Sequence, residues 1–228
     1  MTSTYHGNIM AGLPLFENTA LGQMRDGMTK DEMVAQYDSF AELYDEETAK
    51  RDYQGPRICA EALAKWLGDR KSSCILDVAA GTGLCAEELR KLGFTSIDGL
   101  DPSQRSLDYA MSKNRYNKYI CDFVGANRTS NIDNDSYDAV SCCGGFILGA
   151  MEPDCLPDLI RFVRPGGYVC ITTRNNYLTT VKAYSGGKLE AAMLELQNKG
   201  FWEQVSRDVV PGYHPGIDAV IFVYRVLR

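Results

Sequence analysis

Hydrophobic and polar positions follow two periods that alternate along most of the chain. Short apolar runs of strand length recur at 74–79, 96–100, 118–124, 137–142 and 167–173. Segments with apolar positions at helical spacing occur between and after these runs, at 84–92, 103–113, 154–163 and 187–199. Parallel strands need long crossover connections, and a helix is the usual one. This alternation therefore predicts a parallel sheet with helices on both faces.

The chain ends on a different pattern. Two β-rich runs, 201–209 and 217–227, are joined only by the segment 210–216, which is rich in Pro and Gly. A link this short cannot carry a crossover, so we expect the two strands to be antiparallel. The sequence predicts an α/β fold with a doubly wound, seven-stranded, mostly parallel sheet that closes with a C-terminal antiparallel hairpin.

The N-terminal part precedes this alternating core. Residues 1–28 show no periodicity, and we expect them to form a loose arm. Thr29 and Glu32 have the spacing of a capping box, which predicts a helix over 33–49, and a second helix is predicted over 58–67. The expected organisation is an N-terminal arm (1–28), a helical cap or lid (29–68) and the α/β core (69–228).

Composition narrows the class of protein. The 228 residues carry a net charge of −6 and have a pI near 5.0, which argues against binding to nucleic acid or to an anionic membrane surface. Basic residues do not cluster, and no apolar run approaches the length of a membrane span. The N-terminus lacks the pattern of a signal peptide. We therefore expect no nucleic-acid partner and no membrane partner.

Eight cysteines could suggest disulfides or a metal site. Four of them, however, fall in or beside the predicted strands, where free cysteine behaves as a small hydrophobic residue. No C-x-x-C pair occurs, and the two histidines, His6 and His214, are far apart in the chain. We therefore expect no metal, and we expect a reduced protein in the cytoplasm.

The candidate chemistry begins where the first core strand ends. Asp77 stands inside this apolar run, and Ala79–Gly83 follows it with two glycines just before a helix. Glycines allow a sharp turn and a close approach of ligand to backbone, and the helix start offers unpaired N–H groups. Asp101 follows the second strand, where an acid can accept both hydroxyls of a ribose. Together these features predict a crevice that binds an adenosine group.

These residues resemble the motifs of class I S-adenosylmethionine-dependent methyltransferases, which have a Rossmann-like fold, over roughly 33–228. The matching stretches are Asp77-Val78-Ala79-Ala80-Gly81-Thr82-Gly83, Asp101-Pro102-Ser103, Asp122, Tyr137-Asp138-Ala139-Val140 and Arg164-Pro165-Gly166-Gly167. Ala79 stands where the family usually has its first glycine, and the loop can tolerate alanine there if Ala79 keeps a negative φ. The stretches Tyr37-Asp38-x-x-Ala41-x-x-Tyr44-Asp45 and Tyr53-x-x-Pro56-Arg57 are similar to the methyltransferase-like protein family encoded in the Williams–Beuren region.

The resemblance implies S-adenosylmethionine as the donor and S-adenosylhomocysteine as the product. It implies a role for Asp101 at the ribose, for Asp122 at the adenine, and for the N-terminal helix as a lid whose phenols lie near the donor carboxylate. Asp77 would accept hydrogen bonds from the glycine-loop amides and orient the donor amino group. The expected donor-binding residues are Tyr37, Tyr44, Asp77, Ala79, Ala80, Gly81, Thr82, Gly83, Asp101, Pro102, Asp122, Phe123 and Cys143.

Simpler structural interpretations exist for several of these residues. Tyr37 and Tyr44 could form the apolar face of an amphipathic helix, and the aspartates that follow them, Asp38 and Asp45, could be solvated charges. Asp101 could cap the next helix, although Ser103 can take that role.

The sequence assigns no catalytic residue, and it leaves open whether a general base is used. Methyl transfer from a sulfonium is an in-line displacement, and alignment alone supplies much of its rate. Cys142 and Cys143 could act as nucleophiles in pyrimidine methylation, but that chemistry needs nearby positive charge, and wall packing is the favoured interpretation. The candidates to face the acceptor are Arg174, Asn175, Tyr177 and His214, although Arg174 and His214 could equally face solvent.

Two other functions remain open at this point. Gly81-x-Gly83-x-x-Ala86 fits the dinucleotide fingerprint of an NAD-linked oxidoreductase, and Tyr109-x-x-x-Lys113 resembles a short-chain dehydrogenase pair. That pair comes too soon after the loop, and the antiparallel ending disagrees with this function. A catalytically inactive donor-binding partner is the second alternative. The favoured interpretation is a methyltransferase acting on a small molecule or a protein side chain.

Overall fold

The computed structural model describes residues 27–125 and 132–228, so nearly all of the predicted arm lies outside the described residues. The strands are β1 (Ile75–Val78), β2 (Ile97–Asp101), β3 (Tyr119–Cys121), β4 (Tyr137–Cys143), β5 (Val163–Arg174), β6 (Trp202–His214) and β7 (Ile217–Val226). The helices are α1 (Lys30–Lys50), α2 (Gly55–Leu67), α3 (Leu84–Lys91), α4 (Gln104–Ser112), the 3₁₀ turn η2 (Pro153–Cys155), α5 (Leu156–Arg161), α6 (Tyr177–Thr180) and α7 (Lys188–Asn198).

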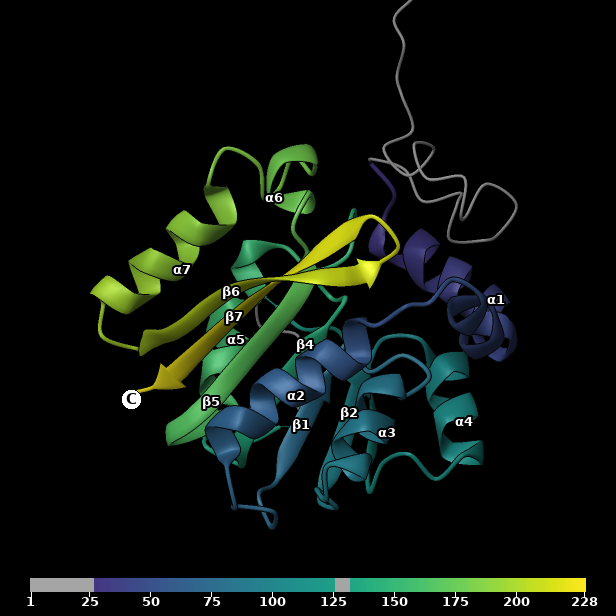
Figure 1. Cartoon of the computed structure of the whole chain (residues 1–228), viewed down its shortest axis with the longest axis horizontal. Coiled ribbons are helices and arrows are strands. Elements are labelled where there is room, and N and C mark those ends of the chain that lie inside the picture. Colours follow the sequence, from purple (N-terminus) through teal and green to yellow (C-terminus); the bar gives the residue numbers. More distant parts are fainter. Residues whose placement is uncertain (1–26, 126–131) are drawn as a thin grey trace, which may run out of the picture.

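The strands form one seven-stranded sheet in the order β3-β2-β1-β4-β5-β7-β6 (Figure 1). The first five strands are parallel, and β7 is antiparallel to both of its neighbours. The predicted fold class and the antiparallel hairpin are therefore confirmed. Strand order reverses at β1, which lies between β2 and β4, and this reversal is where ligands bind in open sheets of this kind.

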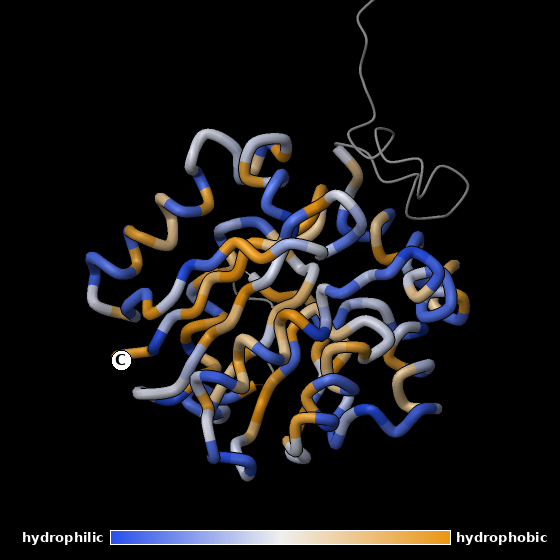
Figure 2. Tube along the Cα trace, viewed as in Figure 1, coloured by the Kyte–Doolittle hydropathy of each residue, from blue (hydrophilic) through white to orange (hydrophobic). Residues whose placement is uncertain are grey.

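Successive residues of the central strands enter two different hydrophobic clusters, one on each face of the sheet. Ile75 and Ala139 belong to the cluster under α2, α3 and α4, whereas Leu76 and Val140 belong to the cluster with α5 and α7. Figure 2 shows hydrophobic positions concentrated along these strands, with polar positions on the outer sides of the helices. Burial on both faces explains why β1 is an unbroken apolar run apart from Asp77.

Two predicted helix starts are confirmed. Thr29 caps α1, with its side chain accepting from the Glu32 amide while the Glu32 carboxylate accepts from the Thr29 amide. Ser103 caps α4, and its hydroxyl accepts from the Ser106 amide at 3.1 Å. Of the two capping candidates before α4, the hydroxyl takes the role and leaves Asp101 to other contacts.

Some boundaries differ from the prediction. The predicted hairpin link at 210–216 is largely strand, because β6 continues to His214 and pairs it with Ile217 across an irregular stretch. The expected strand at 118–124 keeps only the three residues of β3, which is an edge strand with one neighbour. The expected turn at 164–167 belongs to β5, where the register shifts beside β4.

The described residues were also searched for membrane-spanning helices, metal sites and disulfides. Within 27–125 and 132–228, no helix is long and apolar enough to cross a membrane. No group of three or more His, Cys, Asp or Glu side chains in these ranges is arranged to hold a metal ion. All eight cysteines lie in the described ranges, and each is a free thiol.

Candidate functional site

A deep pocket opens at the carboxyl ends of β1, β2 and β4, with α1 on one side. Its volume is about 1130 Å³ including the open mouth. The residues that line it are Lys30, Met33, Val34, Tyr37, Tyr44, Tyr53, Pro56, Val78, Ala79, Ala80, Gly81, Thr82, Leu84, Cys85, Leu100, Asp101, Pro102, Ser103, Ser106, Asp122, Phe123, Val124, Cys143, Gly144, Gly145, Ile147, Gly149, Ala150 and Met151. The pocket therefore lies at the switch point that the sheet order defines.

The glycine loop turns sharply beneath this pocket. Ala79, Gly81 and Gly83 adopt φ values of 56°, 51° and 92°, all in the left-handed region. The condition that Ala79 keeps a negative φ is therefore not met, and the loop holds this alanine in the left-handed region. Alternating left-handed positions reverse the chain quickly between β1 and α3, and a Cβ in that conformation costs about 1–2 kcal/mol.

Asp101 connects the end of β2 to the glycine loop. One carboxylate oxygen accepts from the Gly81 amide at 2.8 Å, and the other accepts from the Ser103 amide at 2.8 Å. Burial raises the pKa of this carboxyl to about 6, although both amides favour its charged form. The residue lines the pocket, as its predicted role requires, and it also fixes the loop that follows β1.

Asp77 is placed differently from the expectation. It is 1% exposed and does not line the pocket. Its two oxygens accept from the hydroxyls of Tyr116 at 2.6 Å and Ser141 at 2.7 Å. The expected bonds from the glycine-loop amides are wrong, because the Gly81 amide bonds to Asp101 instead. Burial raises the pKa of Asp77 to about 7.

The Tyr116 hydroxyl also reaches the Ala80 carbonyl, at 3.2 Å, so Asp77 supports the loop from below through Tyr116. Gly83 does not line the pocket either. Its backbone forms the N-cap of α3, where the chain leaves the loop.

Helix α1 contributes two phenols to the pocket wall. Tyr37 and Tyr44 both line it, with ring centroids 6.4 Å apart. Burial raises the pKa of both phenols above the ordinary value, so they stay protonated and can donate hydrogen bonds. The interpretation of Asp38 and Asp45 as solvated charges is wrong. Their carboxylates accept from the hydroxyls of Ser103 and Thr82, respectively, each at 2.6 Å.

The remaining predicted donor residues also line the pocket. Pro102, Asp122 and Phe123 follow the ends of β2 and β3 on the side of the pocket away from β4. Cys143 ends β4, and its thiol lies 3.4 Å from the Tyr53 hydroxyl. Contact with the Cys59 thiol and burial raise the pKa of Cys143 well above its ordinary value. A protonated thiol supports wall packing rather than a nucleophilic role.

The four predicted acceptor residues do not line the pocket in this structure. Arg174 and His214 are only 6% and 3% exposed, and Arg174 Nη2 lies 3.2 Å from His214 Nε2. The His214 ring stacks on Tyr53, and the Arg174 guanidinium lies over the Tyr177 ring. The alternative that Arg174 and His214 face solvent is therefore wrong. Burial lowers the pKa of His214 to about 4, which keeps the ring neutral.

Asn175 is half-buried, and its backbone amide donates to the Asp218 carbonyl at 2.9 Å. The Tyr109 and Lys113 pair, expected for a dehydrogenase, also lies away from the pocket. Its ammonium sits over the phenol ring on α4, 5.3 Å from the centroid.

Sequence reasoning missed part of the wall. Tyr53 precedes α2, and its hydroxyl lies 3.1 Å from the Tyr213 hydroxyl at the far end of β6. The segment 144–151 follows β4 and supplies several lining residues. Three glycines in that segment were the available signal, since glycine clusters after a parallel strand allow close approach to backbone. For Tyr53, the signal was its place in the quoted motif.

Comparison with known proteins places this geometry in context. Residues 75–167 match the model of a methyltransferase domain family. The chain is 35% identical over 168 residues to human methyltransferase-like protein 27, an alignment that covers 73% of the chain and 66% of the human protein. The chain thus spans somewhat less than two thirds of the length of this relative.

Solved structures share the fold at low sequence identity. A TehB-like S-adenosylmethionine-dependent methyltransferase from Corynebacterium glutamicum matches with a TM-score of 0.57 and 19% identity, covering 84% of this chain and 98% of that one. The [4+2]-cyclase SpnF matches with a TM-score of 0.66 and 14% identity, covering 90% of this chain and 98% of that one. The second match shows that the fold also carries other chemistry.

Proposed function

We propose that the chain is a class I S-adenosylmethionine-dependent methyltransferase and that it transfers the donor's methyl group to a small molecule or a protein side chain. The observation that carries the proposal is the direct bond between the Asp101 carboxylate and the Gly81 amide inside the pocket. This bond joins the acid expected at the ribose to the loop expected at the rest of the donor. The two elements thus form one binding surface.

We assign the donor's parts to the wall as follows. The adenosine half lies along Asp101, which ends β2, and along Asp122 and Phe123, which follow β3. The amino-acid half lies between the glycine loop and the phenols of Tyr37 and Tyr44, which remain protonated and can donate to a carboxylate. S-adenosylmethionine supplies an activated methyl group on a cationic sulfur, and these residues orient it and exclude water.

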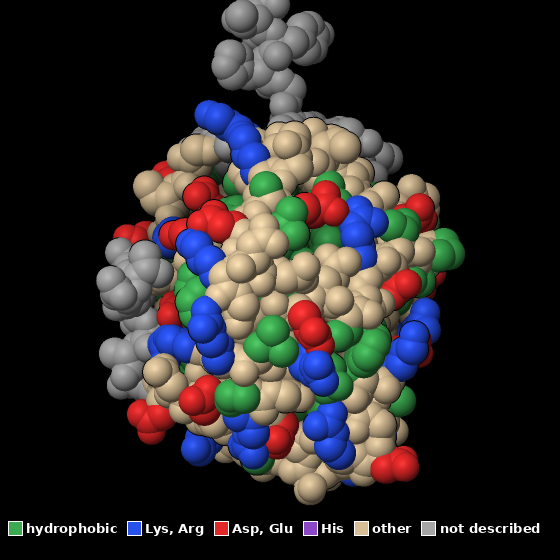
Figure 3. Space-filling model, turned by 90° about the vertical axis from the view of Figure 1, so that its left-hand side faces the viewer, with side chains coloured by type: hydrophobic (Ala, Val, Ile, Leu, Met, Phe, Trp, Pro, Cys, Tyr) green, Lys and Arg blue, Asp and Glu red, His purple; other side chains and the backbone are tan. Residues whose placement is uncertain are grey.

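The acceptor enters a compartment under α1. Met33 and Val34 of α1 and Ile147 and Met151 of the segment after β4 form its apolar wall. An apolar wall beneath a helix fits a small molecule or a single inserted side chain better than a polynucleotide. On the face in Figure 3, acidic and basic side chains are interspersed, and the net charge of the chain is −6. Both features disfavour a nucleic-acid acceptor.

Free thiols support a reducing compartment, and we propose the cytoplasm. A catalytically inactive donor-binding module is the second candidate function. It is favoured by the pocket lining, which includes none of the four candidate acceptor residues.

Transfer of label from S-adenosylmethionine with a tritiated methyl group tests the proposal. The protein is incubated with the small-molecule fraction of a cell extract and, separately, with its protein fraction and its nucleic acid. We expect labelled product in the first or second fraction, and at least about tenfold less at subsaturating donor with the Asp101→Ala variant. Label only in nucleic acid would contradict the acceptor assignment. Donor binding without label in any fraction would favour the inactive module.

A further inference from the structure

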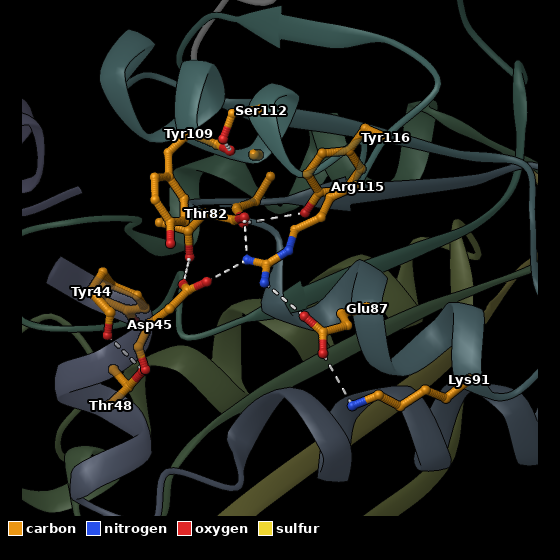
Figure 4. A network of polar contacts seen from close by, with 12 residues as sticks. Tyr44, Asp45, Thr48, Thr82, Glu87, Lys91, Tyr109, Ser112, Arg115 and Tyr116 are labelled. Carbon is orange, nitrogen blue, oxygen red and sulfur yellow. Dashed lines mark hydrogen bonds and ion pairs between the residues drawn. The ribbon is translucent and has the colours of Figure 1, made fainter. Parts of the chain in front are cut away.

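Arg115 lies in the loop between α4 and β3, at the centre of the polar network in Figure 4. One guanidinium nitrogen, Nη1, donates to the Asp45 carboxylate at 2.7 Å and to the Thr82 carbonyl at 2.8 Å. The other, Nη2, donates to the Glu87 carboxylate at 2.7 Å. A single side chain therefore contacts α1, the glycine loop and α3.

The same network closes through α1. The second oxygen of the Asp45 carboxylate accepts from the Thr82 hydroxyl at 2.6 Å, so Asp45 and Arg115 hold Thr82 by its side chain and its carbonyl, respectively. Asp45 adjoins Tyr44, and both Tyr44 and Thr82 line the pocket. Neither Asp45 nor Arg115 lines it. The ion pair thus lies just behind two residues of the proposed donor site.

Packing adds a second contact between Arg115 and the loop. The Arg115 side chain passes over Gly83, and a Cβ on Gly83 would lie 2.7 Å from Arg115 Cδ. The next residue, Tyr116, donates to the Ala80 carbonyl from the same loop. Two adjacent residues before β3 therefore hold the glycine loop in the shape that the pocket requires.

The ion pair is sheltered enough to have an energetic effect. The Arg115 and Asp45 side chains are 11% and 18% exposed, and charge-assisted bonds of this length are stronger than neutral ones. Only a guanidinium can donate in fixed directions to three acceptors at once, because a lysine ammonium is a single point charge. Asp45 and Arg115 are therefore coupled through geometry as well as charge.

We propose that Arg115 is a positioning residue for the donor, holding α1 against the glycine loop through Asp45 and Thr82. The inference rests on the proposed function, which places the donor's amino-acid half between that loop and Tyr44. Breaking the pair loosens mainly the two walls of that half. The adenosine half rests on Asp101 and Asp122. Asp101 bonds to the loop at Gly81 and makes no direct bond to Asp45 or Arg115.

Calorimetric titration with two ligands tests this assignment. S-adenosylhomocysteine carries both halves of the donor, whereas 5′-methylthioadenosine lacks the amino-acid half. We expect Arg115→Gln, Arg115→Lys and Asp45→Asn each to weaken S-adenosylhomocysteine binding about tenfold. Binding of 5′-methylthioadenosine should change by less than about twofold, which is under 0.5 kcal/mol. The double variant of Arg115 and Asp45 should lose no more affinity than the single variant with the larger loss, because both substitutions break the same ion pair.

Arg164→Gln is the matched control. It breaks an aspartate–arginine pair, with Asp138 at 3.1 Å, at the opposite end of the sheet, and it should change neither ligand's affinity. Equal losses for both ligands, or no loss in any folded variant, would overturn the positioning role. If Arg115→Gln does not fold, Arg115→Lys and Asp45→Asn decide the question. Failure of the wild-type protein to bind S-adenosylhomocysteine would instead overturn the proposed function.

Discussion

The Asp101 carboxylate accepts a hydrogen bond from the Gly81 amide at 2.8 Å, across twenty residues of sequence. This contact joins the end of β2 to the loop after β1, and it positions both for one ligand. Because Asp101 is buried and already binds two amides, its loss affects the loop as well as any ribose contact.

We predict that Asp101→Ala weakens S-adenosylmethionine binding by about 1.5–3 kcal/mol, the range for hydrogen bonds to a charged group. Calorimetric titration of the folded variant measures the change. Asp98→Ala is the control, since this acid lies on the same strand but contacts the Tyr137 hydroxyl away from the pocket. Unchanged affinity in Asp101→Ala would remove the acid from the donor site.

Two substitutions at Tyr44 distinguish the contribution of its ring from that of its hydroxyl. Its ring packs near those of Tyr37 and Phe40, with centroids 6.4 and 6.3 Å away. We predict that Tyr44→Phe weakens donor binding by about 0.5–1.5 kcal/mol through the lost hydroxyl. Tyr44→Ala should cost at least about 1 kcal/mol more, because the ring is also lost. Equal losses in the two variants would assign the whole effect to the hydroxyl.

Ala79 carries backbone strain that glycine would relieve. Its φ of 56° is left-handed, so we predict that Ala79→Gly raises the free energy of unfolding by about 0.5–1 kcal/mol in a denaturant titration. Ala80→Gly is the neighbouring control. Its φ is not positive, so the same change should destabilise the protein by about 0.5–1 kcal/mol. Loss of stability in Ala79→Gly would show that the loop does not store this strain.

The raised pKa of Asp77 should make the stability of the folded protein depend on pH. Burial raises its pKa to about 7 from an ordinary value near 3.8, so the folded protein holds a proton that the unfolded chain has lost between these values. The stabilisation of the folded state by protonated Asp77 is therefore fully present below about pH 4, and it is lost as the pH rises through 7.

Asp77→Asn imitates the protonated group at every pH. Between pH 5 and 8, the stability of this variant relative to wild type should rise by about 2–3 kcal/mol. The free energy of unfolding of both proteins is measured by denaturant titration across this pH range. A constant difference between the two proteins would show that Asp77 keeps an ordinary pKa in the folded state.

Much of the fold follows from local pattern. The switch from a helical period to short apolar runs located the strands, and the short link between 201–209 and 217–227 fixed the direction of β7. The glycine loop and Asp101 followed from residue chemistry at strand ends. Boundaries were less accurate where pairing decides them, as in β6, which extends to His214 because Ile217 is its partner.

Side-chain partners far apart in the chain could not be predicted. Asp77 was expected to bond to the adjacent loop, but Tyr116 and Ser141 reach it from other elements. A solvated charge was one alternative for Asp45, and only the tertiary fold places Arg115 beside it. Arg174 and His214 were candidates for the pocket mouth or for solvent, yet they contact each other behind Tyr53.

The most direct test is calorimetric titration of the purified protein with S-adenosylmethionine, S-adenosylhomocysteine and NAD in parallel. We predict that the first two bind at one site per chain and that NAD produces no binding heat. Binding of NAD alone would contradict the assignment of the pocket to a methyl donor. Absence of binding by all three ligands would contradict the adenosine site formed by Asp101 and the glycine loop.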